Sequence, residues 1–221
     1  MNGKSSNQEP KVFILSAPSG GGKTSLARAL ADSCEQVVIS VSHTTRPPRP
    51  GEAEGVDYYF VAPKDFEQMI EAGDFLEYAR VFEHHYGTSR GALEGFLAAG
   101  KSVILEIDWQ GAREVRAAIP SAISIYILPP SVDVLAARLM ARGRDSTSEI
   151  GSRMEKAANE MSHYGEYDYA MVNGDFAAAL TELRQVVLVG RPPLSASGLN
   201  IEALVHSAKS VRLKNLDAAN L

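Results

Sequence analysis

The sequence from residue 12 to residue 24 reads Val12-Phe13-Ile14-Leu15-Ser16-Ala17-Pro18-Ser19-Gly20-Gly21-Gly22-Lys23-Thr24. It begins as an apolar run, passes through a glycine-rich turn and enters a helical pattern that extends to about Asp32. Strand, glycine loop and helix in this order form the context of a phosphate-binding P-loop, G-x-x-x-x-G-K-[ST]. Ala17 departs from the pattern because it fills the first glycine position. The stretch predicts a site for a nucleoside triphosphate, and the alternative is a flexible glycine loop.

The residue types of this loop indicate how it would bind ATP. Glycines let successive backbone N–H groups turn toward a phosphate, and the helix N-terminus adds partial positive charge. Lys23 supplies a point charge for the β- and γ-phosphates, and the Thr24 hydroxyl is a ligand for Mg²⁺, the expected cofactor, together with water and the phosphates. The residues expected to contact ATP here are Ala17, Pro18, Ser19, Gly20, Gly21, Gly22, Lys23, Thr24 and Ser25.

Short apolar runs recur at residues 37–41, 102–107 and 123–128, and each leads toward a helix-like segment. Strands that alternate with helices predict an α/β fold, with a parallel sheet flanked by helices on both faces. Residues 43–95 interrupt this alternation with a proline-rich break, strand patterns at 58–61 and 75–82, and a helical pattern at 63–72. We interpret them as a small α+β lobe inserted into the sheet.

The composition is that of an ordinary globular protein. The chain has 221 residues, 45% of them apolar and 22% charged, which suits one good-sized domain. Its net charge of −5 argues against a general nucleic-acid or membrane-surface binder. The polar first ten residues, the lack of a membrane-length apolar run and the single Cys34 predict a cytoplasmic protein. A reactive thiol is the alternative reading of Cys34.

A second anion site is expected in the segment Ser42-His43-Thr44-Thr45-Arg46-Pro47-Pro48-Arg49-Pro50-Gly51-Glu52. Arginine guanidinium groups bind phosphate oxygens in pairs, and tyrosine hydroxyls, which follow in Asp57-Tyr58-Tyr59-Phe60, add hydrogen bonds without charge. The prolines restrict the backbone and so lower the entropic cost of holding the arginines in place. A solvated turn with incidental arginines is the alternative.

Taken with the P-loop, these segments resemble the guanylate kinase family, in which the γ-phosphoryl group of ATP passes to GMP. The resemblance runs in order through roughly residues 11–188. The stretches that carry it are Ser16–Ser25, Ser40–Glu52, Gly55–Val61, Phe75–Tyr78, His85–Thr88, Glu106–Gly111, Pro129–Ser131, Arg138–Gly143, Arg153 and Val172-Asn173.

The resemblance implies a P-loop NTPase fold with a GMP-binding lobe and a helical lid. It divides the chain into a flexible N-terminus at 1–10, a kinase-like domain at 11–189 and a linker with an appended segment at 190–221. Within the domain, the core would take 11–42 and 96–189, the lobe 43–95 and the lid part of about 138–158.

The resemblance also implies the GMP site. The phosphate would lie among Arg46, Arg49, Tyr58 and Tyr86, and guanine would meet Ser42, Glu77 and Thr88, beside Gly87. A carboxylate suits the N1–H and N2–H₂ donors of guanine, while hydroxyl groups can serve its O6 atom. Without the resemblance, an outward charge on an alternating strand would explain Glu77 equally well.

Two acids close the apolar run at 102–107. Glu106 and Asp108 are two residues apart and so share a face if the strand is regular. In the family this region lies beside the acceptor site, and both are included among the expected GMP contacts. The sequence leaves open which serves guanine and which the water shell of the metal.

Further arginines are expected to close over the transferred phosphoryl group. Arg138, Arg142 and Arg153 are the lid candidates, with Arg144 as an additional one, although arginines on helices are usually solvated. Asn173 resembles the family position that contacts the adenine of ATP. The resulting catalytic set is Lys23, Arg46, Arg142 and Arg153.

Two other classes of protein remain as alternatives. One is a catalytically silent, guanylate-kinase-like interaction module, which would be expected to lack Lys23 or the lid arginines. The other is a kinase for a different phosphorylated acceptor, which would lack the Ser42, Glu77 and Thr88 set. A GTPase is disfavoured because the string Asn-Lys-x-Asp is absent.

The C-terminal segment has apolar residues at helical spacing: Ile201, Leu204, Val205 and Ala208. This spacing suggests the hypothesis of a homo-oligomer in which the segment packs on a neighbouring subunit.

Overall fold

The computed structural model describes the backbone of residues 9–81, 83–141 and 147–218, and side chains within 9–81, 83–141 and 151–210. Contacts within the chain define two compact units. Unit 1 comprises the described residues up to Ile14 with Ala31–Leu105 and Gln110–Ile123, and unit 2 comprises Leu15–Leu30, Glu106–Trp109 and the chain from Ser124 onward. The division into core, lobe and lid stays a prediction.

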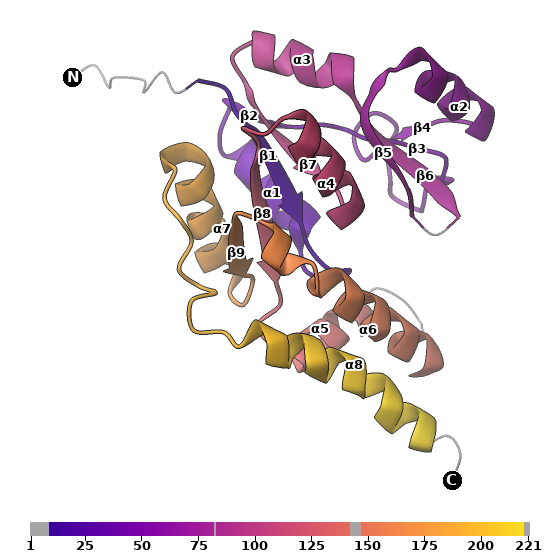
Figure 1. Ribbon diagram of the computed structural model, residues 1–221, viewed down its shortest axis with the longest axis vertical. Coiled ribbons are helices and arrows are strands. Elements are labelled where there is room, and N and C mark those ends of the chain that lie inside the picture. The colour runs from indigo at the N-terminus through magenta and orange to yellow at the C-terminus, as the bar shows by residue number, and fades with distance from the viewer. Residues whose placement is uncertain (1–8, 82, 142–146, 219–221) are drawn as a thin grey trace. The chain divides into compact units, whose positions relative to one another are not determined.

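A five-stranded sheet with the order β2-β7-β1-β8-β9 carries the α/β architecture expected from the sequence (Figure 1). Within unit 1, β2 pairs with β7 in parallel, and within unit 2, β8 pairs with β9 in parallel. The strands are β1 (Val12–Ser16), β2 (Val37–Ile39), β7 (Ser102–Glu106), β8 (Ile123–Leu128) and β9 (Tyr169–Val172).

Unit 1 also contains a four-stranded mixed sheet, which confirms that residues 43–95 leave the parallel pattern. Its order is β4-β3-β6-β5: β3 pairs with β4 in parallel and with β6 in antiparallel fashion, and β5 and β6 are antiparallel. The strands are β3 (His43–Thr44), β4 (Tyr59–Phe60), β5 (Phe75–Val81) and β6 (His84–Ser89). The helices of this unit are α2 (Pro63–Ala72), α3 (Arg90–Ala98) and, from its second residue, α4 (Trp109–Ala118).

Unit 2 contains most of the remaining helices. They are α1 (Lys23–Asp32), α5 (Val132–Met140), α6 (Thr147–Met161), α7 (Phe176–Arg184) and α8 (Ile201–Ala218), with a 3₁₀ turn at Tyr164–Glu166 and a π-helical turn at Gln185–Val189. Asp175 caps α7 by accepting the N–H of Ala178 at 2.9 Å, and Ser131 caps α5 by accepting that of Val134 at 3.2 Å.

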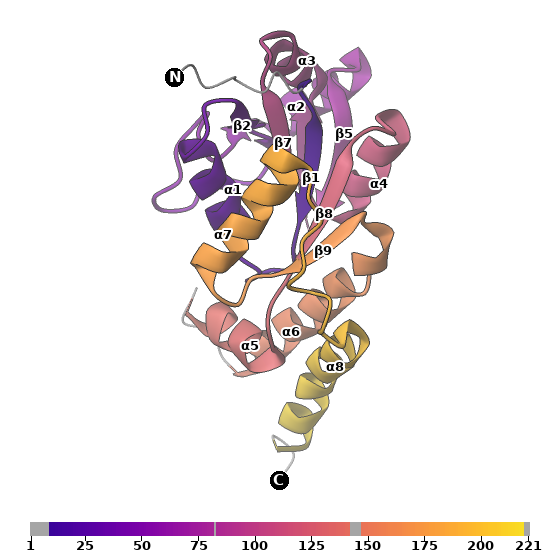
Figure 2. The same cartoon turned by 90° about the vertical axis from the view of Figure 1, so that its left-hand side faces the viewer.

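Helix α8 packs on the helices of its own unit and runs beside α6 (Figures 1 and 2). Its Leu204 and Ala208 are buried in a cluster with Met154, Ala158 and Met161 of α6, and its Ile201 and Val205 pack against that cluster. The apolar residues that suggested a neighbouring subunit therefore have an explanation within the chain, and the homo-oligomer stays a prediction.

Within the described residues, none of the helices is both long enough and apolar enough to cross a bilayer.

Candidate functional site

The glycine-rich loop between β1 and α1 has a backbone conformation that requires glycine at two positions. Gly20 and Gly22 have φ values of +83° and +89°, a region that side chains disfavour. Gly21 donates its N–H to the carbonyl of Pro18 at 2.8 Å, and a Cβ at residue 21 would come within 2.8 Å of the Ala17 Cβ. Ala17 can therefore replace the usual first glycine because residue 21 has no side chain.

The loop is held in place by a segment far along the chain. Asn173, which follows β9 and is buried, donates from Nδ2 to the carbonyl of Gly21 at 2.9 Å. A Cβ at Gly22 would collide with the same amide nitrogen. Asn173, expected to contact adenine, thus supports the P-loop with its only donor group, while its Oδ1 has no hydrogen-bond partner in the described part of the chain.

Arg138, one of the expected lid arginines, is tied to the segment that follows β9. It extends from α5 and donates from Nη2 to the carbonyl of Asn173 at 2.9 Å, while Nη1 is buried without a hydrogen-bond partner among described residues. It is therefore not a solvated surface charge. Arg153 is half-buried on α6, and Arg142 and Arg144 lie outside the described residues. The helical spacing expected between Arg138 and Arg142 is untested, because α5 ends at Met140.

The remaining P-loop residues begin helix α1. Lys23 is half-buried at the first position of the helix, and Thr24 and Ser25 after it are exposed. Leu26 and Leu30 of the same helix are fully buried and fix its orientation in unit 2. The polar end of α1 is thereby open to a ligand.

The two expected acids belong to the same unit as the P-loop. Ser16, at the start of the loop, donates its hydroxyl to the carbonyl of Ile107 at 2.7 Å and so ties the two segments together. Glu106 and Asp108 flank the buried Ile107, and the Oε1 atom of Glu106 is buried without a partner in the described residues. An orphaned carboxylate oxygen is a candidate for hydrogen bonding to a ligand or to metal-bound water.

A third acid of unit 2 was not expected from the sequence. Glu160, near the end of α6, accepts the backbone N–H of Ser19 at 2.8 Å. Burial raises the pKa of Glu160, although the Ser19 N–H, Lys23 and Lys156 oppose that shift. Its sequence signal was weak, since a glutamate within an amphipathic helix usually faces solvent.

In unit 1, Arg46 is buried within the proline-rich segment rather than exposed at a turn. It donates from Nη1 to the carbonyl of Pro47 at 2.8 Å and from Nη2 to Oε1 of Glu52 at 2.8 Å. Its guanidinium lies 5.4 Å from the centre of the Tyr58 ring. Glu52 and Tyr86 both raise the pKa of Arg46, so the group is a permanent cation.

Glu52 organises both arginines, which the sequence did not predict. Its Oε1 binds the side chain of Arg46, and its Oε2 accepts the backbone N–H of Arg49 at 2.7 Å. The hydrogen bond from Arg46 holds the pKa of Glu52 below its usual value. The spacing of an acid three residues after Arg49 and six after Arg46 was its only sequence signal.

The tyrosines expected at this site lie beside Arg46. The rings of Tyr58 and Tyr86 meet edge to face at 5.8 Å, and the Arg49 side chain, three residues after Arg46, is exposed. A buried guanidinium, two phenol rings and a further exposed arginine form a cationic site with hydroxyl groups. Such a site suits a phosphate group.

The expected guanine contacts come together on the mixed sheet. Glu77 of β5 and Thr88 of β6 are paired across the strands, and both are buried. Thr88 donates its hydroxyl to Oε1 of Glu77 at 2.5 Å. Ser42 directly precedes β3, whose first residue, His43, pairs with Gly87, the neighbour of Thr88. Gly87 must lack a side chain, since a Cβ there would lie 2.8 Å from the Phe75 ring.

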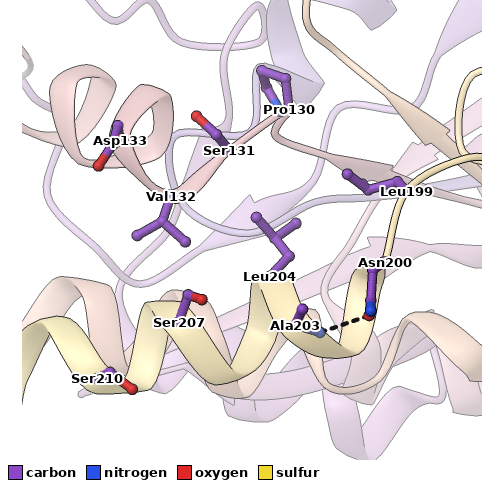
Figure 3. A pocket seen from close by; sticks show the side chains of 10 residues that line it. All are labelled: Pro130, Ser131, Val132, Asp133, Leu199, Asn200, Ala203, Leu204, Ser207 and Ser210. Carbon is purple, nitrogen blue, oxygen red and sulfur yellow. Dashed lines mark hydrogen bonds between the residues drawn. The ribbon is translucent and has the colours of Figure 1, made fainter.

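A pocket of about 710 Å³ lies between the start of α5 and helix α8 (Figure 3). Its wall includes Ser131, Asp133, Leu204 and Ser207, and none of the expected nucleotide contacts. It is not part of the candidate site.

Comparison with known proteins gives a consistent result. The family model for guanylate kinase matches residues 9–188. The guanylate kinase of Alkalilimnicola ehrlichii is 53% identical over 180 residues, which are 81% of this chain and 89% of that protein. That of Chromohalobacter salexigens is 55% identical over 176 residues, or 80% and 82% of the two chains. The crystal structure of guanylate kinase from Anaplasma phagocytophilum aligns with a TM-score of 0.68 and 35% identity, over 82% of this chain and 86% of that one.

Proposed function

This chain belongs to the guanylate kinase family, and from that premise we infer that it is an ATP:GMP phosphotransferase that converts ATP and GMP into ADP and GDP. It is a nucleoside monophosphate kinase of purine nucleotide metabolism. The observation that supports this function most directly is the buried pair of Glu77 and Thr88. The catalytically silent alternative has no support, because Lys23, Thr24 and Arg138 are all present.

We propose that Glu77 recognises the guanine base of GMP. A carboxylate accepts hydrogen bonds only, so it matches the N1–H and N2–H₂ groups of guanine and would oppose the N1 lone pair of adenine. The Thr88 hydroxyl donates its hydrogen bond to Glu77, so it offers only lone pairs to the base. Ser42 is therefore the better donor for O6.

The GMP phosphate is proposed to bind Arg46, Arg49, Tyr58 and Tyr86. A guanidinium has five N–H donors, so the bonds from Arg46 to Pro47 and Glu52 do not exhaust it. Because Glu52 and Pro47 hold Arg46 before the ligand arrives, little side-chain entropy is lost on binding. Glu106 and Asp108 remain proposed contacts on the acceptor side or of the metal's water shell.

ATP is proposed to bind the loop from Ala17 to Ser25, with Lys23 at the β- and γ-phosphates and Arg138 and Asn173 nearby. Nη1 of Arg138 and Oδ1 of Asn173 are buried and have no partner among the described residues, so a nucleotide could satisfy them. Asn173 also has a supporting role, since it holds the carbonyl of Gly21.

Magnesium is the proposed cofactor, and the residues present fit it. The exposed Thr24 hydroxyl would be its protein ligand, with ATP phosphates and water as the others, and the unpartnered oxygen of Glu106 suits a metal-bound water. When bound, the ion supplies positive charge to the phosphates.

The reaction needs no general base. A phosphate monoester has its second pKa near ~6, so the GMP oxygen that attacks the γ-phosphorus is already anionic at neutral pH. The remaining difficulty is repulsion between two anions, which Lys23, Arg46 and the lid arginines Arg142 and Arg153 are proposed to offset. Exclusion of water by the lid would protect ATP from hydrolysis.

The test is a screen of nucleoside monophosphates with Mg·ATP, in which ADP release is followed. We expect GMP to be the preferred acceptor, and Lys23→Ala to lower kcat by about 100-fold or more without changing the unfolding midpoint. Removal of Mg²⁺ with EDTA should stop turnover, and added Mg²⁺ should restore it. Equal use of AMP and GMP, or an active Lys23→Ala variant, would contradict the proposal.

We propose that the enzyme acts in the cytoplasm. Cys34 is a free, half-buried thiol, which is compatible with a reducing compartment. The expectations of no nucleic-acid partner and no membrane partner stay predictions. Fractionation of cells that express the tagged chain would test the location, and recovery outside the cytoplasm would contradict it.

A further inference from the structure

The carboxylate of Glu160 joins helix α6 to the P-loop, although nothing in the proposed reaction requires it. Its Oε2 accepts the N–H of Ser19 at 2.8 Å, across 141 positions of sequence. The charged groups that face it are Lys23, Lys156 and Asp108, and burial disfavours its charge. A partly desolvated carboxylate costs free energy unless a donor compensates it, so the bond to Ser19 has a structural purpose.

The bond acts on a turn of the loop that other hydrogen bonds also hold. Gly21 donates to Pro18 within this turn at 2.8 Å, and Asn173 donates to the carbonyl of Gly21 at 2.9 Å. Glu160 holds the first N–H of the same turn at Ser19. Two segments distant in sequence therefore hold one short piece of backbone. The end of α6 binds its N–H at Ser19, and the residue after β9 binds its carbonyl at Gly21.

Helix α6 is itself fixed at the end that carries Glu160. Met161, the next residue, is fully buried, and the ring of His163 stacks on the indole of Trp109 at 3.9 Å with an interplanar angle of 11°. His163 also forms a hydrogen bond with Glu166 at 2.7 Å between Nδ1 and Oε1. The carboxylate is thus presented to the loop by an immobilised part of the helix.

The same face of α6 carries a proposed catalytic arginine. Arg153 and Glu160 are seven residues apart, which is two helical turns, so both side chains leave the same side of the helix. The hydrogen bond that Glu160 accepts from the P-loop therefore links the position of this arginine to that of the loop.

We propose that Glu160 is a positioning residue of the ATP site, which holds the P-loop in its phosphate-binding form and aligns helix α6 with it. The proposal rests on the proposed function in one respect, namely that ATP binds the P-loop. Glu160 does not touch the reacting atoms; it acts through Ser19.

The test compares three variants of the full chain. Glu160→Leu fills the same space on the helix but accepts no hydrogen bond, Glu160→Gln keeps an acceptor oxygen, and Glu155→Leu is a matched control at an exposed glutamate of the same helix. Glu160→Leu should raise the KM for ATP about tenfold, the effect of losing one hydrogen bond to a charged group, and leave the KM for GMP within about twofold. Glu160→Gln should restore the KM for ATP to within about threefold of the original value.

Two further measurements separate this role from a merely structural one. The dissociation constant of Mg·ATP, measured by calorimetry without GMP, should follow the same order among the variants. The amide resonance of Ser19 in the nucleotide-free protein should shift in Glu160→Leu and not in Glu155→Leu. Equal changes in both KM values, an ATP affinity that matches the Glu155→Leu control, or a lower unfolding midpoint alone would overturn the proposal. A wild-type chain that binds ATP but does not phosphorylate GMP would contradict the proposed function instead, and the ATP affinities would still decide the role of Glu160.

Discussion

Glu77 is a buried carboxylate whose direction depends on one irregularity in strand β5. The strand register moves from the pair Phe75–Ser89 directly to Glu77–Thr88, so two steps on β5 correspond to one step on β6. Such a bulge rotates the following side chains relative to a regular strand. Phe75, Leu76 and Glu77 are consequently all buried, which strict alternation would not allow. The charge is retained in the interior because Thr88 hydrogen-bonds to it.

Replacement of Glu77 by glutamine is the sharpest test of base recognition. The amide has only one acceptor atom, and its NH₂ group would face the N–H donors of guanine, so the KM for GMP should rise about 10- to 100-fold. The KM for ATP should stay within about twofold, because Glu77 is not among the residues proposed to bind ATP. Steady-state kinetics with each substrate varied in turn would measure both.

The exposed Glu94→Gln on α3 provides the control for this substitution. Unaltered GMP kinetics in Glu77→Gln, or an equal loss of affinity for both nucleotides, would remove Glu77 from base recognition.

Individual side chains differ in how far the sequence could predict them. Lys23 and the glycines stand in a motif whose spacing states the chemistry, and they were predicted from it. Glu52 ends one of the stretches that carry the resemblance but had no predicted role, and Glu160 lies outside all of them. Their roles depend on backbone N–H groups that the fold supplies, those of Arg49 and Ser19. A carboxylate that acts on a distant backbone group leaves no pattern in the chain.

At the scale of elements, the proline-rich segment between β3 and β4 behaves as one unit because Glu52 binds both of its arginines. The Glu52 carboxylate uses one oxygen for the Arg46 side chain and the other for the Arg49 backbone. Its pKa is held below the usual value, chiefly by the hydrogen bond from Arg46. A group whose pKa is lower in the folded state stabilises the fold above its unfolded pKa of about 4.3, and this stabilisation is lost as the pH falls through the folded pKa.

Glutamine at position 52 can accept only one of the two bonds, so the arginines should be less well ordered. We expect Glu52→Gln to raise the KM for GMP about tenfold and to leave the KM for ATP unchanged. Acid titration of the unfolding free energy should show a smaller loss below pH ~4.3 in this variant than in the original chain. The exposed Glu67→Gln on α2 is the matched control, and a variant that behaves like it in both measurements would contradict the role of Glu52.

Elements with strong periodicity were predicted with their observed bounds. The helices Lys23–Asp32 and Pro63–Ala72 and the strand Ile123–Leu128 agree with the structure residue for residue. The strand His84–Ser89 was not predicted, because its histidines, tyrosine and glycine have no apolar alternation, and it forms only through pairing with β5. Tertiary pairing, rather than local preference, defines such strands.

At the scale of the whole molecule, the sequence predicted the α/β class but not which part of the molecule its last helix packs against. The family model ends at residue 188, and α8 begins at Ile201. Apolar spacing identifies a buried face and does not identify what covers it, so a neighbouring subunit and the chain's own α6 were equally compatible with the pattern. The structure places that face against Met154, Ala157, Ala158 and Met161.

Leu204→Ala tests this arrangement in the complete chain. Leu204 is 7% exposed within the α6–α8 cluster, and a leucine truncated at such a site loses about 2–4 kcal/mol of unfolding free energy. His206→Ala, at an exposed position of the same helix, should lose less than about 0.5 kcal/mol. Denaturant unfolding measures both, and light scattering gives the molecular mass.

If α8 supports unit 2 from within the chain, Leu204→Ala lowers stability and leaves the mass unchanged. A fall in mass at unchanged stability of the subunit would instead show that the stripe joins two copies of the chain.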